Sequence, residues 1–263
     1  MKRLFLALPL TLLAAPAQNL PFPGPGNAAA TGGGVTGGGI AFVSQPPAAY
    51  NASAGVCVTP GSAATGACQA FNTTGANGIY IWATGAALTS SAAITDAVGS
   101  CAPACNTYVG LPVLNHIRIW YADNGTGSIT VGSGHVLTIS NCQYCAWGAI
   151  AFSGMKTSGS YDGNVTSASN ASGTTVQPGS INPGSGKHLV LNVYWTGDFT
   201  SNTWTPGAGY TAWGDSPFYN GNNYDGAASY LIQTPNGSAT NPVASFGTSV
   251  STLYSYIASF GGA

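Results

Sequence analysis

The chain has 263 residues, of which 38 are glycine and only 4% are charged, with a formal net charge of −1. That length suits one large all-β domain, and the low charge leaves solubility to Ser, Thr, Asn and the backbone. Because no basic excess is present to neutralise phosphates, we expect no nucleic-acid partner.

The N-terminus has the three parts of a secretory signal peptide. Two basic residues precede an apolar run from Leu4 to Ala15, and Ala15-Pro16-Ala17 closes it. We therefore predict a signal peptide over 1–17, a secreted or cell-surface protein, and no transmembrane segment in the mature chain. Its removal leaves three basic side chains against six aspartates, so the formal charge becomes −3.

A segment rich in Gly and Pro follows, with the sequence QNLPFPGPGNAAATGGGVTGGG over 18–39. This composition is typical of a flexible tail or linker. We place the folded domain at 40–263.

Short apolar and β-branched runs then alternate with turn residues along the domain. The stretch Trp147–Asp162, in which an apolar run breaks at Ser153-Gly154, is predicted to be a central strand and its exit. We find no amphipathic helix and expect a single jelly-roll-like β-sandwich of about ten to twelve strands. Strands are predicted over 40–43, 78–82, 116–121, 128–131, 135–139, 147–153, 189–195, 209–213, 227–233 and 253–260.

Six cysteines occur as three pairs that are close in sequence. In an exported chain this arrangement favours local disulfides: Cys57 with Cys68, Cys101 with Cys105, and Cys142 with Cys145. The alternative is a four-thiolate zinc site made by the last four cysteines. A redox role for the Cys142–Cys145 spacing is not favoured, because no helix signal follows it.

A series of short motifs in a fixed order resembles largely uncharacterised, secreted bacterial and phage-associated β-sandwich proteins. These motifs are Ile94-Thr-Asp96, Asn106-Thr-Tyr108, Ile119-Trp-Tyr121-Ala122, Ala151-Phe-Ser-Gly154, Asp162, Gln177-Pro-Gly179, Leu189-Val190 and Tyr230-Leu-Ile-Gln233. The resemblance implies a jelly-roll or concanavalin-like sandwich outside the cell or on a virion, and it brings no catalytic residues. The cysteine-bearing insertion between Asp96 and Asn106 departs from the family pattern.

Catalytic signatures are missing from the sequence. Glutamate is absent, so a two-carboxylate glycosidase would need aspartates, most of which stand in turn-like settings. No Gly-x-Ser-x-Gly elbow occurs, and the three histidines have no metal-ligand spacing. We predict no catalytic and no metal residues, the candidates considered being Asp96, Asp123, Asp162, Asp198, Asp215, Asp225, His116, His135 and His188.

The segment from Thr203 to Asp225 interleaves aromatic residues with Asn, Asp and Gly. Aromatic faces beside amide and carboxylate groups are typical of sugar recognition. The alternative is that Tyr210 and Trp213 face the core. The predicted ligand contacts are Trp204, Tyr210, Trp213, Tyr219, Asn222, Tyr224 and Asp225.

No cofactor is expected, although oxygen ligands between Asn220 and Gly226 offer calcium as an alternative to a simple turn. Asn-x-Ser/Thr sequons begin at Asn51, Asn72, Asn124, Asn164, Asn170 and Asn236. Three functional hypotheses follow. The first is a non-catalytic adhesion or carbohydrate-binding module, the second a self-assembling structural subunit whose tail and strand 40–43 pair with a neighbour's sheet, and the third a polysaccharide hydrolase or lyase.

Overall fold

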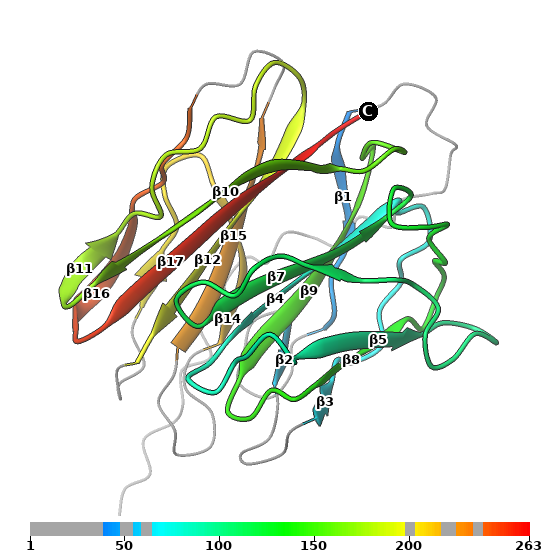
Figure 1. The fold of residues 1–263 in the computed structure, drawn as a ribbon, viewed down its shortest axis with the longest axis horizontal. Helices are drawn as coiled ribbons and strands as arrows, with labels where there is room; N and C mark the ends of the chain where they lie inside the picture. Colours follow the sequence, from blue (N-terminus) through cyan, green and yellow to red (C-terminus); the bar gives the residue numbers. More distant parts are fainter. Residues whose placement is uncertain (1–38, 48–54, 59–64, 198–202, 217–224, 234–238) are drawn as a thin grey trace, which may run out of the picture. The chain divides into compact units, whose positions relative to one another are not determined.

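The computed structural model describes residues 39–47, 55–58, 65–197, 203–216, 225–233 and 239–263, all of which belong to one compact unit, Gly32–Ala263. In these residues the chain forms seventeen β-strands and no helix (Figure 1). The all-β prediction is confirmed, whereas the predicted ten to twelve strands are too few. The predicted signal peptide and all of the predicted tail except Gly39 lie outside the described residues. The part of the chain described here has no helix long and apolar enough to cross a membrane.

The first main sheet has six antiparallel strands in the order β1-β9-β4-β7-β6, and β2 also pairs with β9. Its strands are β1 (Ala41–Ser44), β2 (Val56–Val58), β4 (Gly78–Thr84), β6 (Val109–Gly110), β7 (Ile117–Asp123) and β9 (Ala146–Ser153). The predicted strand at 147–153 is therefore confirmed as β9, and it ends where Gly154 adopts a φ of 74°.

The second main sheet has five antiparallel strands in the order β10-β17-β12-β15-β14. Its strands are β10 (Tyr161–Asn170), β12 (His188–Thr196), β14 (Thr211–Ser216), β15 (Asp225–Gln233) and β17 (Leu253–Gly261). At its centre β12 pairs along its whole length with both β15 and β17.

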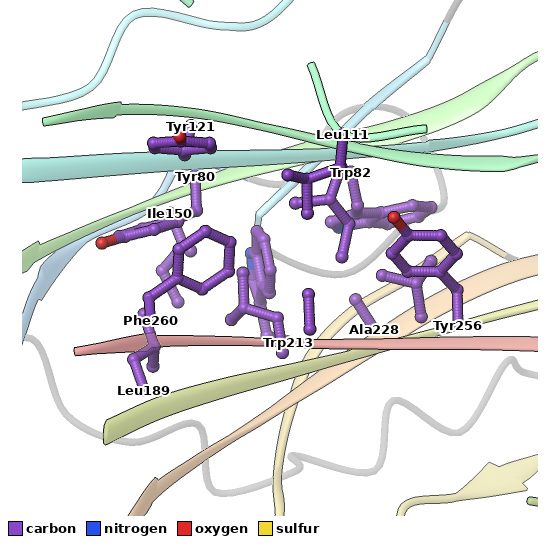
Figure 2. Close-up of a cluster of buried hydrophobic side chains, with 14 of the residues drawn as sticks. Tyr80, Trp82, Leu111, Tyr121, Ile150, Leu189, Trp213, Ala228, Tyr256 and Phe260 are labelled. Carbon is purple, nitrogen blue, oxygen red and sulfur yellow. The ribbon is translucent and has the colours of Figure 1, made fainter. Parts of the chain in front are cut away.

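The core lies between these two sheets, as Figure 2 shows. Because side chains alternate across a strand, Tyr80 and Trp82 of β4 face the second sheet while Ile79 and Ile81 face away from it. The second sheet contributes to this core the inward side chains of β12, β14, β15 and β17, namely Leu189, Leu191, Val193, Trp195, Trp213, Ala228, Tyr256, Ala258 and Phe260.

Two smaller sheets cover the outer faces of the main sheets. One consists of β3 (Thr65–Ala67), β8 (Val136–Ser140) and β5 (Ala93–Ala97), whose Ile94, Leu137 and Ile139 pack on the first sheet. The other consists of β11 (Gly173–Val176), β16 (Ala244–Val250) and β13 (Trp204–Thr205), which pack on Tyr194 of the second sheet. A two-sheet sandwich therefore accounts for only part of the fold.

Two predicted strand positions are wrong. Residues 128–131 form no strand, because the backbone of Thr130 bonds to the side-chain amide of Asn106 instead of to a neighbouring strand. His116 was expected inside a strand, but β7 begins one residue later and His116 occupies the preceding turn.

The six cysteines form the three predicted local disulfides, Cys57–Cys68, Cys101–Cys105 and Cys142–Cys145. The four-thiolate zinc alternative is wrong, because the sulfur atoms that it requires are paired with one another. Disulfides of this kind persist in oxidising compartments, which fits an extracellular environment.

Candidate functional site

The predicted aromatic site is divided between the core and the outer sheet. Trp204 lies in β13, partly buried, with its ring centroid 5.6 Å from that of Tyr194. Tyr210 is buried, and its hydroxyl lies 2.9 Å from Thr240 Oγ1. Burial raises the pKa of the Tyr210 hydroxyl to about 12.

Trp213 joins the two main sheets. Its side chain is 1% exposed, and its indole Nε1 donates a 3.1 Å hydrogen bond to the carbonyl oxygen of Ala149 in β9. The ring also meets Trp82 edge to face, with 6.5 Å between centroids. The structure thus places Tyr210 and Trp213 where the alternative interpretation expects them, away from solvent.

Of the remaining members of the predicted site, the structure describes only the backbone of Asp225. Tyr219, Asn222 and Tyr224 lie outside the described residues, as does most of the calcium candidate segment. Asp225 begins β15, where its backbone pairs with Thr196. Among the described residues, no group of three His, Cys or Asp side chains is arranged to hold a metal ion.

A buried polar network is centred on Asp96, which is 2% exposed. His135 Nε2 lies 2.8 Å from Asp96 Oδ2, and the Tyr108 hydroxyl donates to the same oxygen at 3.0 Å. The backbone N–H groups of Cys105 and Asn106 donate to Asp96 Oδ1 at 2.7 and 3.0 Å. The Asn106 side-chain amide also donates to Oδ2.

This network explains the motifs Ile94-Thr-Asp96 and Asn106-Thr-Tyr108. Asp96 is in β5, whereas Asn106 and Tyr108 follow the Cys101–Cys105 disulfide, so the carboxylate holds the inserted loop against the sheet. The loop between Asp96 and Asn106 is therefore anchored at its end by the acid that precedes it.

The pKa of Asp96 gives this network a pH dependence. Burial alone would raise that pKa, but hydrogen bonds from His135, Asn106 and Tyr108 outweigh it and hold the pKa below its ordinary value of 3.8. A lowered folded-state pKa contributes stability that is present above pH 3.8 and is lost as the pH falls through the folded-state pKa. We therefore expect the stability difference between wild type and Asp96→Asn to shrink below about pH 4, measured by urea unfolding from pH 7 to pH 2. A difference that stays constant over this range would contradict the assignment.

The order Thr73, His135, Asp96 has the connectivity of a hydroxyl–imidazole–carboxylate triad. Thr73 Oγ1 lies 3.0 Å from His135 Nδ1. However, Thr73 and His135 are both 0% exposed, and the Gly132 backbone N–H donates to the same Oγ1 at 3.0 Å. A substrate carbonyl could not approach this hydroxyl, so we interpret the arrangement as structural.

The other two aspartates with described side chains are also bonded within the fold. Asp123 Oδ1 accepts from the backbone of Gly125 and Thr126 at 2.8 and 3.0 Å, which confirms the predicted turn role. Asp123 Oδ2 accepts from the backbone N–H of Ser160 at 2.7 Å. All three bonds are made to backbone donors, so this carboxylate holds two loops together.

Asp162 joins strands of the second sheet. Ser259 Oγ lies 2.7 and 2.6 Å from the two carboxylate oxygens, and His188 Nε2 lies 3.5 Å from Oδ2. Oδ1 also accepts from the backbone of Asn164 at 3.0 Å. The serine hydroxyl bonds to the carboxylate and not to the histidine, and Ser259 is fully buried, so the pair does not form a serine–histidine nucleophile that a substrate could reach.

One aromatic cluster was not predicted from the sequence. The ring of His116 lies 5.0 Å from Trp195 and 5.5 Å from Tyr254, and those two rings stack at 5.0 Å. His116 belongs to the turn before β7, whereas Trp195 and Tyr254 pair across β12 and β17. Both His116 and Tyr254 are partly exposed, so the cluster lies at the end of the core where the two main sheets meet solvent.

Comparison with protein-family models, curated proteins and solved structures finds no match to this chain.

Proposed function

We propose that the protein is an exported, non-catalytic β-sandwich that binds carbohydrate as an adhesion or surface module. The observation that carries this proposal concerns the described acids. Asp96, Asp123 and Asp162 each accept several hydrogen bonds from within the fold. The one hydroxyl–imidazole–carboxylate series among them, Thr73–His135–Asp96, has a fully buried hydroxyl that a substrate could not reach. Catalytic carboxylates need an approachable position and a tuned pKa, so binding is favoured over turnover.

The composition supports the same function. A charged fraction of 4% leaves a surface of hydroxyl, amide and aromatic groups, which suits an uncharged polar ligand. The signal-peptide pattern and the three disulfides support export. The resemblance to secreted and phage-associated sandwiches points the same way, and Trp204 remains a predicted contact.

The self-assembly alternative has less support. Residues Ala41–Ser44 pair with β9 of their own chain, so exchange with a neighbouring subunit would first break these hydrogen bonds. Phe42, 44% exposed at this edge, is the feature that favours self-association. We therefore favour ligand binding.

Affinity electrophoresis of the mature protein in gels containing soluble polysaccharides tests the proposal. We expect retardation by at least one polysaccharide without release of reducing ends during prolonged incubation. Equal mobility in every gel would contradict binding, and release of reducing ends that Asp162→Asn abolishes would favour the hydrolase hypothesis.

A further inference from the structure

We infer that the ligand is a neutral saccharide and that it is bound at one end of the sandwich by the rings of His116 and Tyr144. This inference rests on the proposed function and names the place and the ligand class for it. We call the part of the molecule that carries the side chains of His116, Tyr144 and Tyr254 and the buried Trp195 the aromatic end.

The first observation is the geometry of the turn that carries His116. Leu114 and Ile117 exchange both backbone hydrogen bonds, at 3.0 and 2.9 Å, so they close a two-residue hairpin. The central residues Asn115 and His116 have φ values of 50° and 63°. Two positive φ values are the mark of a type I′ turn, in which Asn-Gly is the preferred pair.

His116 thus stands where glycine is favoured. A side chain there strains the backbone, whereas glycine adopts the conformation freely. The imidazole at this position lies against Trp195 and Tyr254 and is partly exposed. A ring used only to fill the core would be expected to be fully covered, so its exposed edge points to a ligand.

Tyr144 repeats this pattern in the adjoining loop. Its φ is 51°, its side chain is 37% exposed, and it lies inside the loop closed by the Cys142–Cys145 disulfide. A bulky residue in the left-handed region is a real outlier. Neither local backbone preference nor burial explains a tyrosine at this position.

The two loops are neighbours. The backbone N–H of Gly85 donates to the His116 carbonyl at 3.1 Å, and a Cβ added at Gly85 would lie 3.1 Å from the Tyr144 carbonyl oxygen. In the described residues, the four non-glycine residues with positive φ all belong to these two loops, the other two being Asn115 and Asn141. Strain of this kind gathers at binding and catalytic sites.

The ligand class follows from the groups at the aromatic end. Rings stack on the apolar faces of sugars. The Asn115 amide already donates to Ser167 Oγ at 3.2 Å, so it holds the turn and is not counted as a ligand contact. The nearby cation, Arg118, donates to the carbonyls of Leu111, Ser90 and Ala92 and stacks over a tryptophan. No carboxylate is among the described side chains that form this surface, so the groups present suit a neutral ligand.

The aromatic end lies far from the point where the described chain begins. The described chain begins at Gly39, which lies against Gly154, and Ile40 lies against Gly262. These residues adjoin the start of β12, because His188 pairs with Gly261. β12 has nine residues, so its two ends are about 27 Å apart. The aromatic end therefore lies at the opposite end of β12 from Gly39, the first residue that the structure describes.

The test compares the polysaccharide affinity of variants that lose a ring at a position of positive φ with that of variants changed at a position of positive φ that carries no ring. The mature protein is titrated with neutral polysaccharides (β-glucan, xylan, galactomannan) and acidic ones (alginate, hyaluronan), followed by calorimetry. The variants are His116→Gly, Tyr144→Gly and their combination. Asn115→Gly and Asn141→Gly are matched controls, because they relieve the same backbone conformation in the same loops without removing a ring.

We expect wild type to bind a neutral polysaccharide, and the double variant to bind it about tenfold more weakly. The controls should bind as wild type does, and every variant should keep the wild-type circular dichroism spectrum. If His116→Gly fails to fold, His116→Asn replaces it, since Asn tolerates positive φ.

The inference is overturned if the folded double variant binds like wild type, if Trp204→Ala alone abolishes binding, or if wild type prefers acidic polysaccharides. In each of these cases the proposed binding function still stands. Failure of wild type to bind any of the five polysaccharides would instead count against the proposed function itself.

Discussion

Replacing Asp96 with alanine is expected to lower the free energy of unfolding by about 3–5 kcal/mol, the usual cost of removing one partner from a buried charged group. The reason is the number of donors that lose their acceptor. His135 Nε2, the Tyr108 hydroxyl and two backbone N–H groups all point at this carboxylate. Each buried donor left without a partner is costly, about 1–3 kcal/mol.

Thr95→Ala is the matched control for this change. Thr95 precedes Asp96 in β5 and points to solvent, so its loss should change stability by less than about 0.5 kcal/mol. Both variants are compared with wild type by urea unfolding at pH 7 with the disulfides intact. Equal stability of Asp96→Ala and Thr95→Ala would mean that the carboxylate does not anchor the loop after Cys105.

The strands that could be predicted from the sequence are those with the longest apolar runs. Residues 147–153 and 189–195 are predicted to be strands because they are rich in apolar residues, and in the structure they lie in β9 and β12. Because these runs do not alternate with polar residues, they also indicate strands buried on both faces of the sheet, and every residue of β12 is indeed buried. The outer sheets that cause this burial were missed because strands such as β3 and β13 have only three and two residues.

The candidate site was harder to predict, for two physical reasons. Composition gives the residue types of 203–225 but not their burial, so Trp213 was indistinguishable from Trp204. The clue to His116 was present in the sequence, because Asn115 precedes an apolar run as the first residue of a hairpin turn does. A boundary error of one residue placed His116 in the strand and concealed its turn position.

Tyr144 was concealed in another way. It lies inside a Cys-x-x-Cys pair, a pattern that indicates a role for the cysteines and not for the residue between them. Only the backbone φ of 51° marks the tyrosine itself as unusual. Local sequence does not encode which loops become neighbours. The contact through Gly85 arises only after β4 and β9 pair, over residues far apart in the chain.

Trp213→Ala is expected to destabilise the protein by about 3–5 kcal/mol, as large-to-small changes at buried aromatic positions do. The change opens a cavity beside Trp82 and removes the hydrogen bond from Nε1 to the Ala149 carbonyl, so it weakens the contact between β14 and β9. Trp213→Phe should cost less, about 1–3 kcal/mol, because it keeps most of the apolar volume and leaves mainly the carbonyl without its donor.

Trp204→Ala provides the comparison from the same predicted site. Its ring is partly exposed and packs against the cluster that contains Tyr194 and Phe246, so its loss should cost about 1 kcal/mol. Urea unfolding followed by far-ultraviolet circular dichroism measures the three variants under one set of conditions. If Trp213→Ala were no more destabilising than Trp204→Ala, the placement of Trp213 between the main sheets would be wrong. If the expected order holds, loss of ligand binding in Trp213→Ala would report unfolding, and Trp204 and His116 would be the informative positions for mapping the ligand.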